Sequence, residues 1–126
     1  MTHALIIDDN GTGIDVLGAL LSAQNVSYSG LQDPSQIHAA LAELNQADVI
    51  FLDLEMPDIN GYEMLEILRN ELQVSVPIIA YSVHTAEINV ARELGFDGFL
   101  GKPLRREHFP THLKRILAGQ GVWEAN

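Results

Sequence analysis

The chain has 126 residues, enough for one domain, and its 17 acidic and 7 basic residues give a formal charge of −10. Such a charge argues against nucleic acid as the main ligand, and the absence of cysteine excludes disulfides, thiolate metal sites and a cysteine nucleophile. No apolar run is long enough to span a membrane, and the N-terminus lacks the pattern of a signal peptide. The composition therefore predicts one acidic, cytoplasmic domain that binds neither nucleic acid nor membranes.

Five short apolar segments alternate with helical patterns along the chain. The segments cover residues 4–7, 27–31, 49–52, 77–81 and 98–100. Several are apolar throughout instead of alternating with polar residues. This pattern is typical of strands in a parallel sheet that is covered on both faces.

Helix start and stop signals occupy the intervals between these segments. Thr12 and Asp15 have the spacing of a capping box, which predicts that the first helix starts at Thr12. Pro110 is tolerated only in a first helical turn, so the last helix is expected to begin late or to bend there. The other signals are Asp33–Pro34, Asn60 and Thr85 at helix starts, and Gly95 and Gly119 at helix ends.

Strict alternation of strands and helices predicts a parallel sheet with right-handed crossovers and helices on both faces. Five strands match the flavodoxin-like, doubly wound α/β fold, with strand order 2-1-3-4-5 and five helices. The expected domain covers residues 1–119, and residues 120–126 are expected to form a short tail.

Polar side chains stand where the predicted strands end. Asp8 and Asp9 follow the first strand, Asp53 ends the third, Ser82 follows the fourth, and Lys102 follows the fifth. In this topology, ligands bind at the carboxyl ends of the strands, near the point where the first and third strands meet. These five side chains are therefore expected to converge on one edge of the sheet.

The chemistry of these five groups points to phosphoryl transfer. Carboxylates about 4 Å apart repel one another by roughly 4 kcal/mol per pair at an effective dielectric constant near 20, so the cluster needs a cation. Oxygen ligands alone favour Mg²⁺. Lys102 provides a point charge for a phosphoryl oxygen, and Ser82 a hydrogen-bond donor. Because a carboxylate can accept a phosphoryl group, the set predicts an aspartyl-phosphate site.

Four segments carry a resemblance to a known family: IIDDN at 6–10, DLEMPDING at 53–61, PIIAYS at 77–82 and GKP at 101–103. In this order they closely resemble the receiver domain of bacterial two-component response regulators, over nearly the whole chain. The resemblance implies that Asp53 accepts a phosphoryl group from a histidine kinase or a histidine phosphotransfer protein. It also implies that Lys102 holds a phosphoryl oxygen.

The same resemblance assigns the metal and switch residues. Asp9, Asp53 and the backbone carbonyl of Glu55 would bind Mg²⁺, and Asp8 would act mainly through water. Ser82 would move toward the phosphoryl group while Phe99 turns inward, which would change the surface that an unknown downstream protein recognises. The Lys102–Pro103 peptide is expected to be cis.

The first predicted helix has an unusual surface, because between Gly13 and Gln24 its only charged residue is Asp15. Ordinary packing of a buried helix is one interpretation, and an apolar docking face is the other. The resemblance favours docking of the phosphodonor protein on this helix. The apolar residues that fall outside the core stripe are Val16, Ala19, Leu20 and Ala23.

Two other functions are compatible with parts of the sequence. A nucleotide-binding enzyme is suggested by Gly11-Thr-Gly13 after the first strand and by Asp33 further along, but Val16 stands where the third glycine of that motif belongs. A pseudo-receiver that only binds proteins would not be expected to keep the complete set of five site residues. We therefore predict a phosphoacceptor receiver domain, and not an enzyme that acts on an external substrate.

Overall fold

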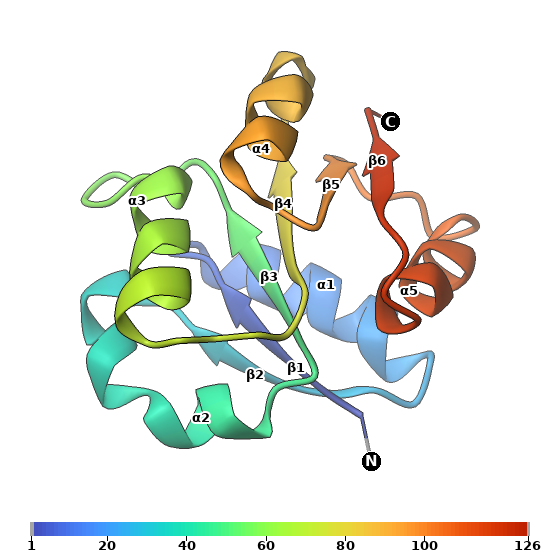
Figure 1. The fold of residues 1–126 in the computed structure, drawn as a ribbon. Helices are drawn as coiled ribbons and strands as arrows, with labels where there is room; N and C mark the ends of the chain where they lie inside the picture. The colour runs from blue at the N-terminus through green and yellow to red at the C-terminus, as the bar shows by residue number, and fades with distance from the viewer. Residues whose placement is uncertain (1, 126) are drawn as a thin grey trace.

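A computed structural model describes residues 2–125 as one sheet with helices on both faces (Figure 1). The predicted strand order is confirmed for the first five strands, but the prediction of five strands is wrong. The sheet has six parallel strands in the order β2-β1-β3-β4-β5-β6. They are β1 (His3–Ile7), β2 (Ser27–Leu31), β3 (Val49–Asp53), β4 (Ile78–Ser82), β5 (Gly98–Gly101) and β6 (Val122–Glu124).

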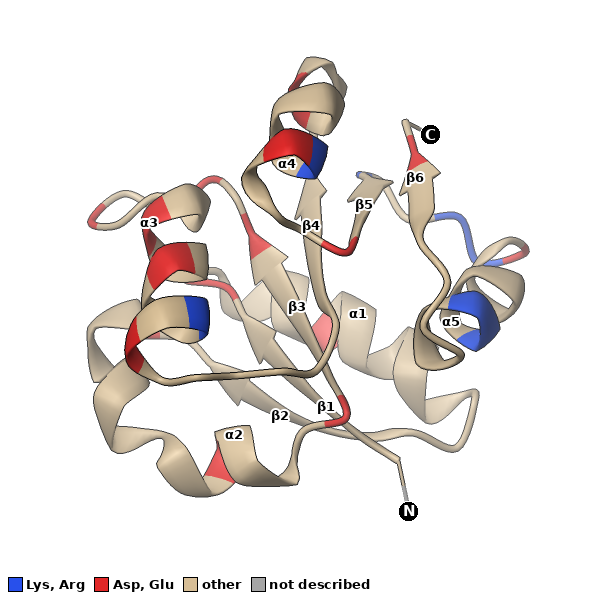
Figure 2. Cartoon of the chain, in the orientation of Figure 1, with Lys and Arg blue, Asp and Glu red and all other residues tan. Residues whose placement is uncertain are grey.

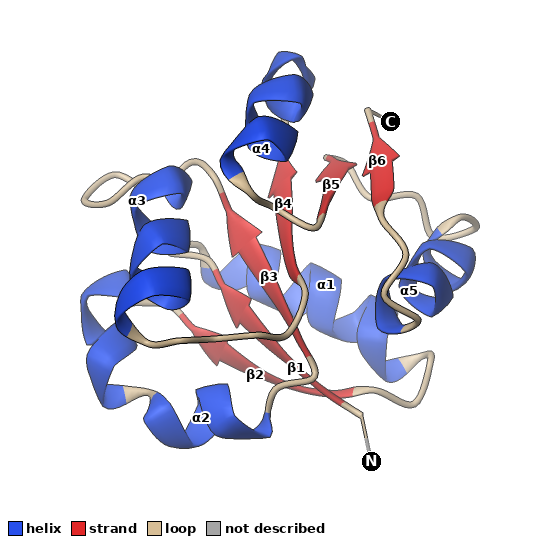
Figure 3. Ribbon diagram, in the orientation of Figure 1, coloured by secondary structure: helices blue, strands red, loops and turns tan. Residues whose placement is uncertain are grey.

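The expected five helices are accompanied by shorter helical segments, so the predicted helix count is also too low for the described residues (Figure 3). The α-helices are α1 (Gly11–Ser22), α2 (Leu41–Gln46), α3 (Gly61–Glu66), α4 (Ile88–Leu94) and α5 (Phe109–Leu117). The additional segments are the 3-10 turns η1 (Pro34–Ala39) and η3 (Thr85–Glu87) and the π-helical turn η2 (Ile67–Glu71). Within residues 2–125, none of these helices has the length and apolarity to cross a membrane.

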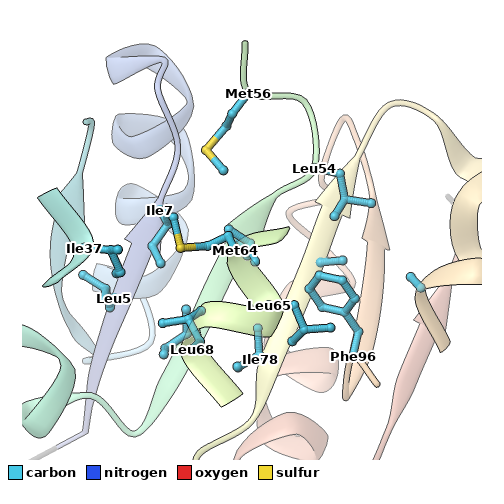
Figure 4. Packing of buried hydrophobic residues seen from close by; sticks show 14 of the residues in the cluster. Leu5, Ile7, Ile37, Leu54, Met56, Met64, Leu65, Leu68, Ile78 and Phe96 are labelled. Carbon is cyan, nitrogen blue, oxygen red and sulfur yellow. The ribbon is translucent and has the colours of Figure 1, made fainter. Parts of the chain in front are cut away.

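Each face of the sheet has its own hydrophobic core. Alternate residues of a strand point to opposite faces, so Ala4 and Ile6 pack toward α1 and α5, while Leu5 and Ile7 pack toward α2, α3 and α4. Figure 4 shows the second core, where Met64 of α3 lies beside Ile7 of β1 and Leu65 lies beside Phe96. Because both faces are covered, the central strands are buried throughout, which explains their continuous apolar sequence.

Most of the predicted helix ends are confirmed, and one is wrong. Asn60 caps α3, where its side chain accepts a hydrogen bond from the Glu63 N–H over 2.9 Å. The first helix starts at Gly11 instead of Thr12, because the Asn10 side chain accepts the Thr12 N–H over 2.9 Å. As expected, α5 begins late, with Pro110 in its first turn, where the missing N–H has no intrahelical partner to lose.

The sixth strand comes from the expected tail. Phe99 of β5 stands in register with Trp123 of β6, and the Arg92 guanidinium of α4 lies 5.0 Å from the centroid of the Trp123 ring. Arg115 of α5 donates a hydrogen bond to the Gly121 carbonyl over 3.1 Å. Three residues are too few to give a strand pattern in the sequence. Val122–Glu124 form a strand because they pair with the open edge of β5.

Candidate functional site

Three carboxylates meet at the carboxyl edge of the sheet. Asp8 and Asp9 follow β1, and Asp53 is the last residue of β3. Strands β1 and β3 are neighbours, with Ile7 in register with Leu52, so their ends lie side by side. One carboxylate oxygen from each of the three residues lies within 4.8 Å of the other two. The predicted convergence of Asp8, Asp9 and Asp53 is thus present in the structure.

The Asp8 carboxylate is buried and held from two sides. Its Oδ1 accepts a hydrogen bond from the backbone N–H of Asn10 over 2.9 Å. Its Oδ2 accepts a hydrogen bond from the Tyr81 hydroxyl over 2.6 Å. Because each oxygen has one donor, the orientation of this carboxylate is set by the protein alone.

Asp53 is also buried, with only 3% of its surface exposed. Its Oδ1 accepts the backbone N–H of Glu55 over 3.0 Å and lies 3.4 Å from the Lys102 Nζ. The pKa of the Asp53 carboxyl is raised to about 8, mainly by burial and next by a hydrogen bond with the Glu55 side chain, while the Lys102 charge acts in the opposite direction. The Lys102 ammonium therefore does not balance the three carboxylates by itself when no cation is bound.

Lys102 reaches the carboxylates from the segment after β5. Its backbone N–H donates to the Ser82 carbonyl over 2.8 Å, which extends the pairing of β4 with β5 by one bond. The peptide between Lys102 and Pro103 is cis, as expected. The Lys102 Nζ lies 4.4 Å from the centroid of the Tyr81 ring.

Ser82 ends β4, and its hydroxyl donates a hydrogen bond to the Glu55 carboxylate. The hydroxyl oxygen in turn accepts the His84 N–H over 2.8 Å, and the His84 Nε2 lies 3.6 Å from the Glu55 carboxylate. Ser82 thus lies at the predicted edge of the sheet but is engaged by Glu55. Phe99 is fully buried within β5, in register with Ala80 of β4.

Comparisons with known proteins decide the family. The profile of the response regulator receiver domain matches residues 4–114. The chain belongs to this family. Among solved structures, a response regulator receiver domain from Clostridium thermocellum superposes with a TM-score of 0.81 at 18% identity, covering 94% of this chain and 95% of that one. Chemotaxis response regulator CheY4 of Vibrio cholerae has a TM-score of 0.76 at 26% identity, covering 92% and 98%.

Sequence relatives of the receiver domain include both regulators and kinases. NarL, a nitrate/nitrite response regulator of Escherichia coli, is 34% identical over 123 residues, covering 94% of this chain and 56% of NarL. Hybrid signal transduction histidine kinase L of Dictyostelium discoideum is 30% identical over 122 residues, covering 88% of this chain and 7% of the kinase. The receiver domain thus spans about half of NarL and a small part of the kinase.

The residues of the receiver domain fit a hard cation at the acidic cluster. The candidate ligand atoms there are carboxylate oxygens, two of the three residues are buried, and the Lys102 ammonium approaches Asp53. Carboxylate oxygens at such short separations are the donor set that Mg²⁺ takes, with water completing its shell. Asp8, Asp9 and Asp53 are the residues that would surround it, directly or through water.

Sequence reasoning missed two side chains of the receiver domain's site. Tyr81 contacts both Asp8 and Lys102, and the Glu55 carboxylate contacts Ser82, whereas only the backbone carbonyl of Glu55 was predicted to take part. Tyr81 did leave a signal, because a tyrosine within a fully buried strand needs a partner for its hydroxyl. Glu55 left none, since an acidic residue in a loop is ordinarily solvated.

Proposed function

We propose that Asp53 of this receiver domain accepts a phosphoryl group from a phosphohistidine of a histidine kinase or phosphotransfer protein. A carboxylate oxygen of Asp53 attacks phosphorus, a new P–O bond forms, and the P–N bond breaks with its electron pair passing to the donor imidazole. The protein thus serves as a phosphoacceptor in signalling and not as an enzyme acting on an external substrate. One observation carries this proposal: the Asp53 Oδ1 lies 3.4 Å from Lys102 and beside two further carboxylates.

The roles of the surrounding groups follow from their charges. Asp9, Asp53 and the Glu55 backbone carbonyl would bind Mg²⁺, with Asp8 acting through water, and the ion supplies positive charge to the transferring phosphoryl oxygens. The Lys102 ammonium would pair with one of these oxygens. We assign residues 1–119 to this phosphoacceptor unit and residues 120–126 to a tail that contributes β6.

Phosphorylation is proposed to reach the surface through Ser82 and Phe99. The Ser82 hydroxyl now donates to Glu55, and a phosphoryl group on Asp53 would offer it a doubly charged acceptor instead. Phe99 lies in the next strand, β5, in register with Ala80, two residues before Ser82. A turn of its ring would alter the surface formed by α4, β5, β6 and α5, where we place the downstream protein.

Intact mass measurement after incubation with acetyl phosphate and Mg²⁺ tests the proposal. Wild-type protein is expected to gain one phosphoryl group, and Asp53→Asn and metal-free wild type are expected to gain none. If neither acetyl phosphate nor a phosphorylated histidine phosphotransfer protein modifies the wild type, the proposal fails. A phosphorylation-independent interaction module would then remain.

The phosphodonor is proposed to dock on the apolar side of α1. Four residues support this placement, because Val16, Ala19, Leu20 and Ala23 line one groove together with Leu104, Arg106, Phe109 and Pro110. Figure 2 shows basic residues on α5 and the segment before it, and Arg106 of that segment lines the groove. The groove therefore joins an apolar helix face to positive charge, beside the carboxyl edge of the sheet.

Introducing a charge into this groove is expected to slow transfer from the protein donor. Ala23 is exposed, so Ala23→Glu disturbs little packing but places a carboxylate among apolar groups, and we expect at least about a tenfold loss (about 1.4 kcal/mol). Phosphorylation by acetyl phosphate should not change. Ala42→Glu is the control, since Ala42 is exposed on α2 over the opposite face of the sheet. Equal loss with both donors would contradict docking at this groove.

A further inference from the structure

Tyr81 connects two parts of the site that come from distant strands. Its side chain is 2% exposed, its hydroxyl lies 2.6 Å from the Asp8 Oδ2, and its ring centroid lies 4.4 Å from the Lys102 Nζ. Asp8 follows β1 and Lys102 follows β5. One buried side chain therefore contacts both a carboxylate of the acidic cluster and the ammonium group that approaches Asp53.

The hydroxyl contact limits how the Asp8 carboxylate can turn. Each oxygen of this carboxylate accepts one hydrogen bond, from Asn10 on one side and from Tyr81 on the other. A carboxylate oxygen has two lone pairs, so each oxygen keeps one for a cation or its water. Burial and the Asp8 carboxylate raise the pKa of Tyr81, which keeps its hydroxyl protonated and able to donate.

The ring contact limits Lys102 in the same way. An ammonium group over an aromatic face is attracted by the electrons of the ring, and a lysine side chain has considerable rotational freedom to lose. With the ring on one side and the Asp53 Oδ1 at 3.4 Å, the ammonium is directed toward the acidic cluster.

We propose that Tyr81 is a positioning residue of the phosphoacceptor site, which holds the Asp8 carboxylate through its hydroxyl and the Lys102 ammonium through its ring. The expected effect of Tyr81 on phosphorylation rests on the proposed function. The contact with Asp8 can be tested without phosphate or metal, so the two can fail separately.

A double-mutant cycle in metal-free protein tests the contact with Asp8. Tyr81→Phe removes the hydroxyl and is expected to lower the melting temperature by about 3–6 °C, because the buried Asp8 loses a donor. In an Asp8→Ala background the same change should have no destabilising effect. Tyr28→Phe is the control, since Tyr28 lies at the surface of β2. Equal destabilisation by Tyr81→Phe in both backgrounds would overturn the inference.

Calorimetric titration with Mg²⁺ tests the consequence for the site. Loss of a group that orients a metal ligand typically weakens binding 10–100-fold, so Tyr81→Phe should raise the Kd for Mg²⁺ about tenfold, while Tyr28→Phe should not change it. Phosphorylation by acetyl phosphate should be slower in Tyr81→Phe and slower again in Tyr81→Leu, which also lacks the ring. Wild-type Mg²⁺ affinity and phosphorylation rate in Tyr81→Phe would overturn the inference. If wild type itself takes no phosphate, the proposed function fails, and the metal-free cycle still decides the Tyr81 contact.

Discussion

Asp53→Asn is expected to raise the melting temperature of the metal-free protein at pH 7.5 by about 6 °C, from a stabilisation of about 2 kcal/mol. The wild-type carboxylate is buried and lies beside Asp8 and Asp9. Near neutral pH, the folded protein must either keep this charge among two like charges and away from water, or take up a proton that the unfolded chain does not hold. An asparagine has nearly the same shape and no charge, so the variant avoids this penalty.

The raised pKa of Asp53 also predicts how the stability of the folded protein depends on pH. The pKa of Asp53 is raised from 3.8 to about 8 in the folded protein, so the folded state binds the proton more tightly than the unfolded state. The contribution of this group to stability is complete below pH 3.8 and is lost as the pH rises toward 8. Wild-type melting temperatures in EDTA should therefore fall between pH 5 and pH 8, and those of Asp53→Asn should fall much less.

Asp58→Asn is the matched control for this comparison. Asp58 lies in the loop after β3 and is exposed, so its substitution removes the same charge from a solvated position and should change little. Mg²⁺ should raise the melting temperature of wild type by binding the folded state, and should have less effect on Asp53→Asn. If the melting temperatures of wild type and Asp53→Asn depend equally on pH, the buried Asp53 carboxyl does not destabilise the folded protein as inferred.

Gly13→Ala is expected to damage the site although it is a favourable change for an ordinary helix. A Cβ at Gly13 would lie 2.3 Å from the Asp8 Oδ2. The carboxylate has little room to withdraw, because Asn10 and Tyr81 hold it. Overpacking of this kind destabilises by about 1–3 kcal/mol. It also turns Asp8 away from the cluster, so we expect Mg²⁺ binding to weaken by about tenfold or more.

Gly11→Ala is the control for this effect on the same helix. Its Cβ would approach only the side chain of Gln32, at 3.3 Å, which is exposed and free to adjust. Thermal melting and Mg²⁺ titration of the two variants should therefore separate clearly, with Gly11→Ala near wild type. Similar behaviour of the two would refute the close approach of α1 to Asp8. The close approach of Asp8 also explains why a glycine stands at position 13, without a role for Gly13 in a nucleotide-binding motif.

Local signals in the sequence were sufficient for most of the fold. The apolar strands, the caps at Asp33 and Asn60 and the stop at Gly95 depend on interactions within a few residues, and each is present in the structure. The strand order followed from the match of five alternating strands to the flavodoxin-like fold, while alternation itself predicted the parallel sheet and its right-handed crossovers. The acidic cluster followed as well, since the carboxyl ends of neighbouring strands must meet.

Other features depend on groups that are distant in the sequence. β6 exists because β5 has an open edge and Gly98 permits close approach, with its Cβ position 2.9 Å from the Val122 carbonyl oxygen. Tyr81 lies 73 residues from Asp8, and Ser82 meets Glu55 across 27 residues. The sequence alone determined the first five strands, the α-helices between them and which charged groups converge, because strand alternation and strand ends are local properties. Only the tertiary structure decided which neighbours hold those groups, because side-chain hydrogen bonds depend on distances that packing sets.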